Sequence, residues 1–283
     1  MTLGKEYDGI YQYPQIVQDW WKQEKNYLIE YDNAQRDNRL CAIYFSSNDI
    51  WFPHTEEIFR HRIVEKNFFE WYKCRINAAH KHIFLRDVFK QWYLTGINAD
   101  IPTQEKLLEF LKEETNGYRV VTIGSSAGGY AAVYFGQRLN ADYVIAFNAQ
   151  FSLERLVRQS TKSTNPILFS MLKPIGGGGN ILLNDNAVPV FYVYSNHSKW
   201  DNEQHQYIKE CKSVQCIEFN SKKHGIPFLK VALPVFINFK KKDLERLTTT
   251  IHYSISFTVQ LVGLFKAIKG FFDQVYQVYK KRH

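Results

Sequence analysis

The sequence has no pattern of cysteines or histidines suited to binding a metal. Its four cysteines form no Cys-x-x-Cys pair, and no cluster of histidine and cysteine has the spacing of zinc ligands. Cys41 lies inside an apolar run typical of a buried strand, so we interpret the cysteines as reduced thiols. We therefore expect a cytoplasmic protein with no bound metal and no resident cofactor.

Long hydrophobic segments are also missing. The first residues, MTLGKEYDGIYQYP, contain no apolar segment of the kind found in a signal peptide, and we expect none. The stretch Leu247–Phe265 is uncharged, but its Thr, Ser, Gln and His residues are too frequent to predict a membrane span. The sequence contains no internal repeats, and the run Gly176–Gly179 is its one low-complexity piece.

The composition is that of a folded protein with an uneven charge. Of the 283 residues, 45% are hydrophobic, which is enough for one sizeable core. Residues 240–283 contain nine Lys or Arg against three acidic residues, so +6 of the net charge of +8 falls there. We predict a catalytic domain over residues 1–239 and a basic segment over 240–283, whose partner is anionic. A nucleic-acid-binding body is not expected.

Strands and helices are predicted to alternate along most of the chain. Strands are expected at Tyr27–Tyr31, Leu40–Phe45, His82–Leu85, Tyr118–Ile123, Tyr143–Phe147, Val188–Tyr194 and Val214–Phe219, the first two forming a hairpin across a polar turn. Helices are expected from the cap Thr55 to Tyr72, after the cap Thr103 over Gln104–Glu113, and over Ala127–Leu139 and Asn202–Glu210. This alternation predicts an α/β fold, with a mostly parallel sheet covered by helices on both faces.

Residues 150–187 interrupt this pattern. The segment contains Pro166, Pro174 and the glycine run, and it is long for a simple connection. We therefore predict a lid inserted over a site.

The central motif is Gly124-Ser125-Ser126-Ala127-Gly128-Gly129, directly after a predicted strand and directly before a predicted helix. It matches G-x-S-x-G in the context of the nucleophile elbow of α/β-hydrolases, where a sharp turn exposes the serine hydroxyl and needs small neighbours. The alternatives are a tight turn without catalysis or a phosphate-binding loop. A phosphate loop is poorly supported, because neither the P-loop lysine nor the G-x-G-x-x-G spacing is present. Ser126 is thus the candidate nucleophile.

An elbow serine needs partners that activate it and stabilise charge. The Ala127 N–H, at a helix N-terminus, is a candidate oxyanion donor, and Ser46 or Ser47 in the loop after an early strand could supply a second. His224 follows the last predicted strand of the sheet, where the base is expected. It could also be an ordinary surface histidine.

The acid of the site is expected after the strand Val188–Tyr194. Asp201 is the first choice and Glu203 the fallback. Asp201 could instead only cap the following helix, since aspartate is a favoured N-cap. The segment Arg86–Tyr93, which mixes charges and aromatic rings, could contact carbohydrate or belong to the core.

Four segments resemble α/β-hydrolase-like proteins encoded with bacterial capsule and surface-polysaccharide genes. They read IYFSSNDIWFPHTEE, HIFLRDVFKQWYLTGIN, TIGSSAGGYAA and KKHGIPF, and they span roughly Leu40 to Phe228. G-S-S-x-G-G with a late His-Gly occurs in capsule O-acetyltransferases of this fold. The resemblance implies Ser126, Asp201 and His224 as a catalytic triad and acetyl-CoA as an acyl donor, although no CoA motif is visible.

The C-terminal segment predicts an amphipathic basic helix. From Leu261 to Tyr279 the apolar residues fall on one helical face, and Lys280-Lys281-Arg282 close the chain. The helix could lie on an anionic inner membrane, pack on the core or form a dimer contact. Upstream, Ile251–Val259 alternates with period two and could be a strand.

The sequence therefore favours a serine esterase or O-acetyltransferase that works through an acyl-Ser126 intermediate on a surface glycan or its precursor. The alternative is a catalytically silent protein of the same fold that binds or scaffolds a polysaccharide-synthesis complex. A peptidase or lipase of this fold is a third, weaker possibility.

Overall fold

The computed structural model describes residues 6–7, 10–11, 13–36, 38–159, 179–184 and 187–282. The strands are β1 (Glu6–Tyr7), β2 (Ile10–Tyr11), β3 (Tyr27–Tyr31), β4 (Leu40–Phe45), β5 (Lys81–Leu85), β6 (Arg119–Ser125), β7 (Tyr143–Phe147), β8 (Val190–Ser195) and β9 (Val214–Phe219). The α-helices are α1 (Gln15–Gln23), α2 (Glu56–Phe59), α3 (Gln104–Glu114), α4 (Ala127–Arg138), α5 (Leu153–Gln159), α7 (Lys199–Ile208), α8 (Leu233–Phe236), α9 (Lys241–Leu247), α10 (Ser254–Val262) and α11 (Leu264–Arg282).

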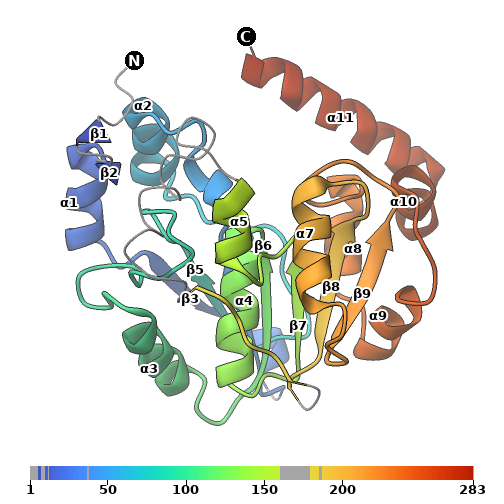
Figure 1. Ribbon diagram of the computed structural model, residues 1–283, viewed down its shortest axis with the longest axis horizontal. Helices are drawn as coiled ribbons and strands as arrows, with labels where there is room; N and C mark the ends of the chain where they lie inside the picture. Colours follow the sequence, from blue (N-terminus) through green and yellow to red (C-terminus); the bar gives the residue numbers. More distant parts are fainter. Residues whose placement is uncertain are drawn as a thin grey trace.

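One seven-stranded sheet organises the molecule (Figure 1). Its strand order is β3-β5-β4-β6-β7-β8-β9, and every neighbouring pair is parallel except β3 with β5. With helices on both faces and a serine between β6 and α4, this is an α/β-hydrolase fold, as predicted. The predicted hairpin is wrong, because β3 pairs with β5 and β4 lies between β5 and β6.

Alternate residues of the strands belong to two separate hydrophobic cores, one on each face of the sheet. Cys41, Ile43 and Phe45 of β4 point to the face covered by α3, α4, α5 and α7. Ala42 and Tyr44 point to the opposite face, where α8, α9 and α10 pack. Because both faces are covered, the inner strands are apolar throughout, which is why they could be recognised in the sequence.

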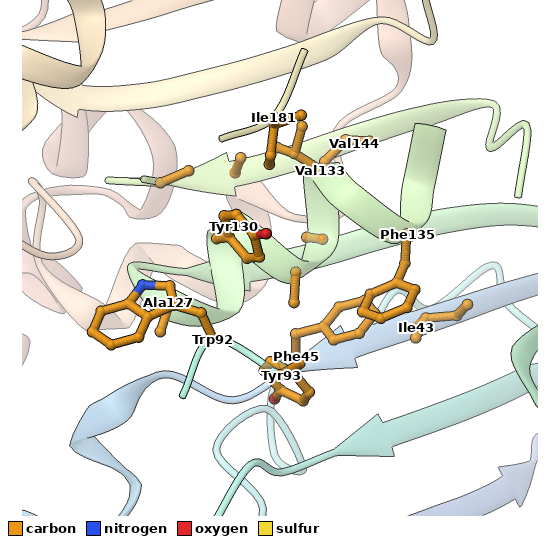
Figure 2. Close-up of a cluster of buried hydrophobic side chains, with 14 of the residues drawn as sticks. Ile43, Phe45, Trp92, Tyr93, Ala127, Tyr130, Val133, Phe135, Val144 and Ile181 are labelled. Carbon is orange, nitrogen blue, oxygen red and sulfur yellow. The ribbon is translucent and has the colours of Figure 1, made fainter. Parts of the chain in front are cut away.

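The helix α4 packs more closely on the sheet than a helix with side chains at the contact positions could. Phe45 stacks on Phe135 with ring centroids 5.5 Å apart and meets Tyr93 edge-on, as Figure 2 shows. A Cβ at Gly128 would lie 2.2 Å from the Phe45 carbonyl oxygen, and one at Gly124 would lie 1.9 Å from the Gly128 carbonyl oxygen. These glycines let the first turn of α4 touch β4 and β6.

Two predicted elements differ from the structure. The helix capped by Thr55 continues through a π-helical turn, Arg60–Glu65, and ends there instead of at Tyr72. The chain then turns, since Asn67 has a positive φ, so that Phe69 and Trp71 can enter the sheet core. The predicted strand in Ile251–Val259 is wrong from Ser254 on, where the helix α10 begins and buries Phe257 and Thr258. Most of the predicted lid lies outside the described residues.

The last two helices lie at the end of the sheet where the parallel strands finish (Figure 1). Gly263, with φ of +81°, separates α10 from α11, so the predicted amphipathic helix begins at Leu264 instead of Leu261. Lys230, which follows His224 in the chain, donates its N–H to the Gln274 side chain of α11. Among the described residues, no helix is both long and apolar enough to cross a membrane.

We predict that replacing Gly128 by Ala will unfold or strongly destabilise the protein, by about 4 kcal/mol or more, because the new methyl group would meet backbone atoms that cannot move away. Gly117→Ala is the matched control. Gly117 has a positive φ of +78°, but its nearest neighbour is a side-chain atom at 3.6 Å, so a cost of about 1 kcal/mol is expected. Urea denaturation of both variants measures the difference. Similar losses would contradict the close-approach argument.

Candidate active site

Ser126 stands at the turn between β6 and α4 in a strained backbone conformation. Its φ is +53° and its ψ is −117°, a region that costs a non-glycine residue of order 1–3 kcal/mol. The surrounding structure holds it there: the Ser126 N–H donates to the Phe147 carbonyl at 2.8 Å. The side chain remains partly exposed at the carboxyl edge of the sheet.

The three residues predicted for the catalytic centre meet in space. Ser126 Oγ is 3.2 Å from His224 Nε2, and His224 Nδ1 is 2.6 Å from Asp201 Oδ1. Asp201 is 1% exposed, whereas the His224 side chain is 30% exposed and rests beside the Trp200 ring. A buried carboxylate at this distance favours the Nδ1–H tautomer, which leaves Nε2 free to accept the serine proton.

The second oxygen of Asp201 has its own donors. Asn148 Nδ2 lies 2.6 Å from Asp201 Oδ2, and the Ser195 N–H donates to the same oxygen at 3.3 Å. The helix cap at this position is Ser198, whose hydroxyl accepts from the Asp201 N–H, so capping is not the task of Asp201 itself. These donors satisfy the second carboxylate oxygen, which is buried away from water.

The loops that carry Asp201 and His224 are tied to each other. Ser195 Oγ donates to the Lys223 carbonyl at 2.6 Å, one residue before His224. The His197 N–H donates to the Ser221 carbonyl at 3.0 Å. These two hydrogen bonds hold the loops of Asp201 and His224 together.

Gln150 is a buried polar side chain that also reaches the serine. Its Nε2 lies 3.2 Å from Ser126 Oγ and 3.2 Å from the Asn148 carbonyl, and its Oε1 accepts from the Trp92 indole N–H at 3.0 Å. Because indole can only donate, the Trp92 contact fixes which end of the amide faces Ser126. Ser126 Oγ thus accepts from Gln150 while its proton points to His224.

The loop that carries Trp92 is built around a buried carboxylate. Asp87 accepts hydrogen bonds from the backbone N–H groups of Phe89, Gln91 and Tyr93. Burial raises the pKa of Asp87 to about 6, although these hydrogen bonds oppose the shift. Asp87, Val88, Lys90 and Trp92 are buried, so the core interpretation of Arg86–Tyr93 describes most of this segment.

The predicted oxyanion donors differ in their partners. The Ala127 N–H lies in the first turn of α4, directly beside Ser126. The Ser46 N–H donates to the Leu85 carbonyl at 3.0 Å as part of the sheet edge. The Ser47 N–H donates to the Glu70 carboxylate at 2.5 Å. Burial raises the pKa of Glu70, and the bonds from Ser47 counter this shift.

A polar cleft of 180 Å³ opens beside Ser47 and Glu70. Asp49, Arg62, Glu70 and Lys230 supply its charged lining, with Ile50, Phe52 and Phe68. Within the described residues, no group of three or more His, Cys, Asp or Glu side chains is placed to hold a metal ion. Among the residues that line this cleft, we find no set with the features of a cofactor site.

Sequence reasoning placed the three central residues but missed their supports. Glu203, the fallback acid, faces Arg155 at 3.9 Å instead of His224. Asn148 and Gln150 come directly after β7, at the carboxyl edge where site residues gather in parallel sheets, and this position was the available signal. Glu70 lies in a turn with no motif around it.

No family model and no curated protein matches the chain. Solved structures align with the chain at low identity. A capsule O-acetyltransferase of Neisseria meningitidis serogroup A aligns at 10% identity over 69% of this chain and 83% of that one, with a TM-score of 0.47. Esterase B from Lactobacillus rhamnosis aligns at 10% identity over 93% of this chain and 94% of that one, with a TM-score of 0.45. MenH from Staphylococcus aureus aligns at 10% identity over 80% of this chain and 100% of that one, with a TM-score of 0.44. At this level of similarity, function has to be argued from the chain's own geometry.

Proposed function

We propose that this protein is a serine-dependent acyl-transfer enzyme that forms an acyl-Ser126 intermediate. The observation that carries the proposal is the continuous line of contacts from Ser126 Oγ through His224 to buried Asp201. A serine hydroxyl is a poor nucleophile at its ordinary pKa, and an adjacent oriented imidazole is the standard way to activate it.

The proposed reaction has two halves. In the first, His224 Nε2 takes the Ser126 proton while Oγ bonds to the acyl carbon, and the imidazolium then gives that proton to the departing oxygen or sulfur of the donor. In the second, His224 takes a proton from water or a sugar hydroxyl, the new oxygen attacks the acyl carbon, and Ser126 regains its proton. Asp201 stabilises the imidazolium in both halves without itself being protonated.

The developing oxyanion needs donors that are already in place. The Ala127 N–H is the first. We propose Gln150 Nε2 as a second, because its orientation is fixed by Trp92 and it lies 3.2 Å from Ser126 Oγ, next to the acyl carbon on which the oxyanion would form. Ser47 remains a candidate for conformations in which its bond to Glu70 opens.

The acceptor is proposed to be a hydroxyl-rich molecule, a surface glycan or its precursor, with acetyl-CoA as donor if the enzyme is a transferase. The resemblance of four sequence segments to capsule-associated proteins supports this class. The charged cleft beside Ser47 is consistent with it, since carboxylates and guanidinium groups bind hydroxyls well.

A catalytically silent binding or scaffold protein of the same fold is the second candidate. One observation favours it: both early-loop amides, Ser46 and Ser47, have partners, and Ser47 faces a carboxylate where an oxyanion would lie. Reaction with a fluorophosphonate separates the two candidates, because only an activated serine is labelled.

We predict that Ser126→Ala abolishes both fluorophosphonate labelling and hydrolysis of p-nitrophenyl acetate, because the only oxygen within reach of His224 Nε2 in the described site is removed. The fold should be retained, since the side chain is small and partly exposed. Ser125→Ala, one residue earlier in the same motif, is the control and should still be labelled. Labelling that survives in Ser126→Ala would overturn the proposal.

Asp201→Asn should lower kcat by about 10⁴-fold, because an amide cannot stabilise the imidazolium and favours the wrong tautomer of His224. Glu203→Gln, on the same helix but beside Arg155, should leave kcat within about twofold of the wild-type value. Steady-state kinetics of both variants decides between the two acids. The reverse result would make Glu203 the acid.

Gln150→Met keeps the length of the side chain and removes its donor, so kcat should fall about 10²–10³-fold with KM little changed. Trp92→Phe removes the N–H that orients the amide together with part of a buried ring, and a smaller fall in kcat is expected. Circular dichroism shows whether each variant is folded. If folded Gln150→Met has the wild-type kcat, Gln150 is no oxyanion donor and only packs beside Ser126.

A further inference from the structure

The helix α11 shows two different faces to its surroundings. Ala267, Gly270 and Gln274 lie within one arc at 100° per residue, and this arc packs on the body. Ala267 is buried, a Cβ at Gly270 would lie 2.6 Å from Val231, and Gln274 accepts the Lys230 N–H. The contacts with the protein are thus made on this side.

A second arc of the same helix is apolar and open. Leu264, Phe265, Ile268, Phe272 and Val275 recur at helical spacing away from the packed side, and Phe265 is 88% exposed. This is the face that the sequence pattern predicted to be hydrophobic, and it is not covered by the described part of the domain. Exposing so many large apolar side chains to water is unfavourable, so this face has the character of an interaction surface.

The segment before α10 and the first turn of that helix also expose large apolar side chains. Ile251, Tyr253 and Ile255 are each more than half exposed. Between α10 and α11 lies an apolar hollow of 270 Å³ with Ile255, Val259, Leu264, Ile268 and Phe272 in its lining. We define the docking face as these exposed apolar residues of Ile251–Ile255 and of α11.

Charge indicates which partner the docking face fits. Residues 240–283 hold +6 of the net charge, and Lys266 and Lys269 fall on the polar arc of α11 beside the apolar one. A second copy placed face to face by a two-fold axis would bring two such basic segments together. A negatively charged lipid surface instead attracts every one of these charges, and apolar side chains bordered by lysines suit its interface.

We propose that this docking face binds the surface of an anionic lipid bilayer, with α11 lying in the plane of the interface. The phenyl rings enter the boundary between headgroups and acyl chains, and the lysines contact the lipid phosphates and carboxylates. The proposal does not depend on whether Ser126 is an active nucleophile.

Co-sedimentation of the full chain with lipid vesicles tests the proposal. At low salt, binding to vesicles of phosphatidylcholine and phosphatidylserine should be about tenfold or more stronger than binding to phosphatidylcholine alone, and salt should weaken it. Phe265→Glu and Phe272→Glu should each reduce binding about tenfold or more, because both rings are exposed and their loss leaves the fold intact. Leu182→Glu is the matched control, as Leu182 is also 88% exposed but lies outside the docking face.

Three outcomes would overturn the proposal. The first is equal or no binding of the wild-type chain to the two kinds of vesicle. The second is binding that Phe265→Glu and Leu182→Glu reduce equally. The third is a dimer in sedimentation velocity that Phe265→Glu dissociates while vesicle binding is absent, because a second copy of the chain would then be the occupant. Circular dichroism of each variant excludes unfolding as the cause.

Discussion

The close contact between the first turn of α4 and the strands β4 and β6 is the constraint on which the candidate site depends. Gly124 and Gly128 have no side chain to separate these backbones, and a Cβ at either would lie about 2 Å from a carbonyl oxygen. The helix therefore begins immediately after Ser126, which is forced into its positive φ. The strain aims the hydroxyl away from the core and toward His224.

The other residues of the candidate site come from loops around Ser126. Asn148 and Gln150 follow β7, Asp201 follows β8, and His224 follows β9. Three neighbouring strands therefore each place site residues at their carboxyl ends. Buried polar groups of this kind are costly when unpaired. Each of these side chains has a specific neighbour, although the Asn148 Oδ1 atom has no hydrogen-bond partner among the described residues. Asn148 holds Asp201, Trp92 holds Gln150, and Ser195 holds the loop before His224.

The sequence was most informative where one local pattern determines the structure. The strands β7 and β9, the caps Thr55 and Thr103, and the turn at Ser126 were all predicted, because each depends on adjacent residues. The pairing of β3 with β5 was not, since strand partners are chosen by long-range packing. The period-two pattern of Ile251–Val259 was overridden by burial of Phe257 in a helical contact. Glu70 has no local signature, because its neighbours come from distant segments.

The contact between Lys230 and Gln274 links α11 to the same edge of the sheet that carries Ser126. If both proposals hold, a protein bound to a bilayer through α11 would carry Ser126 on the edge of the sheet beside that helix, near the lipid surface. Acceptors confined to that surface would meet the serine by diffusion in two dimensions. Turnover would then follow the number of acceptors per unit area of membrane, and dilution of the surrounding solution would have little effect on it.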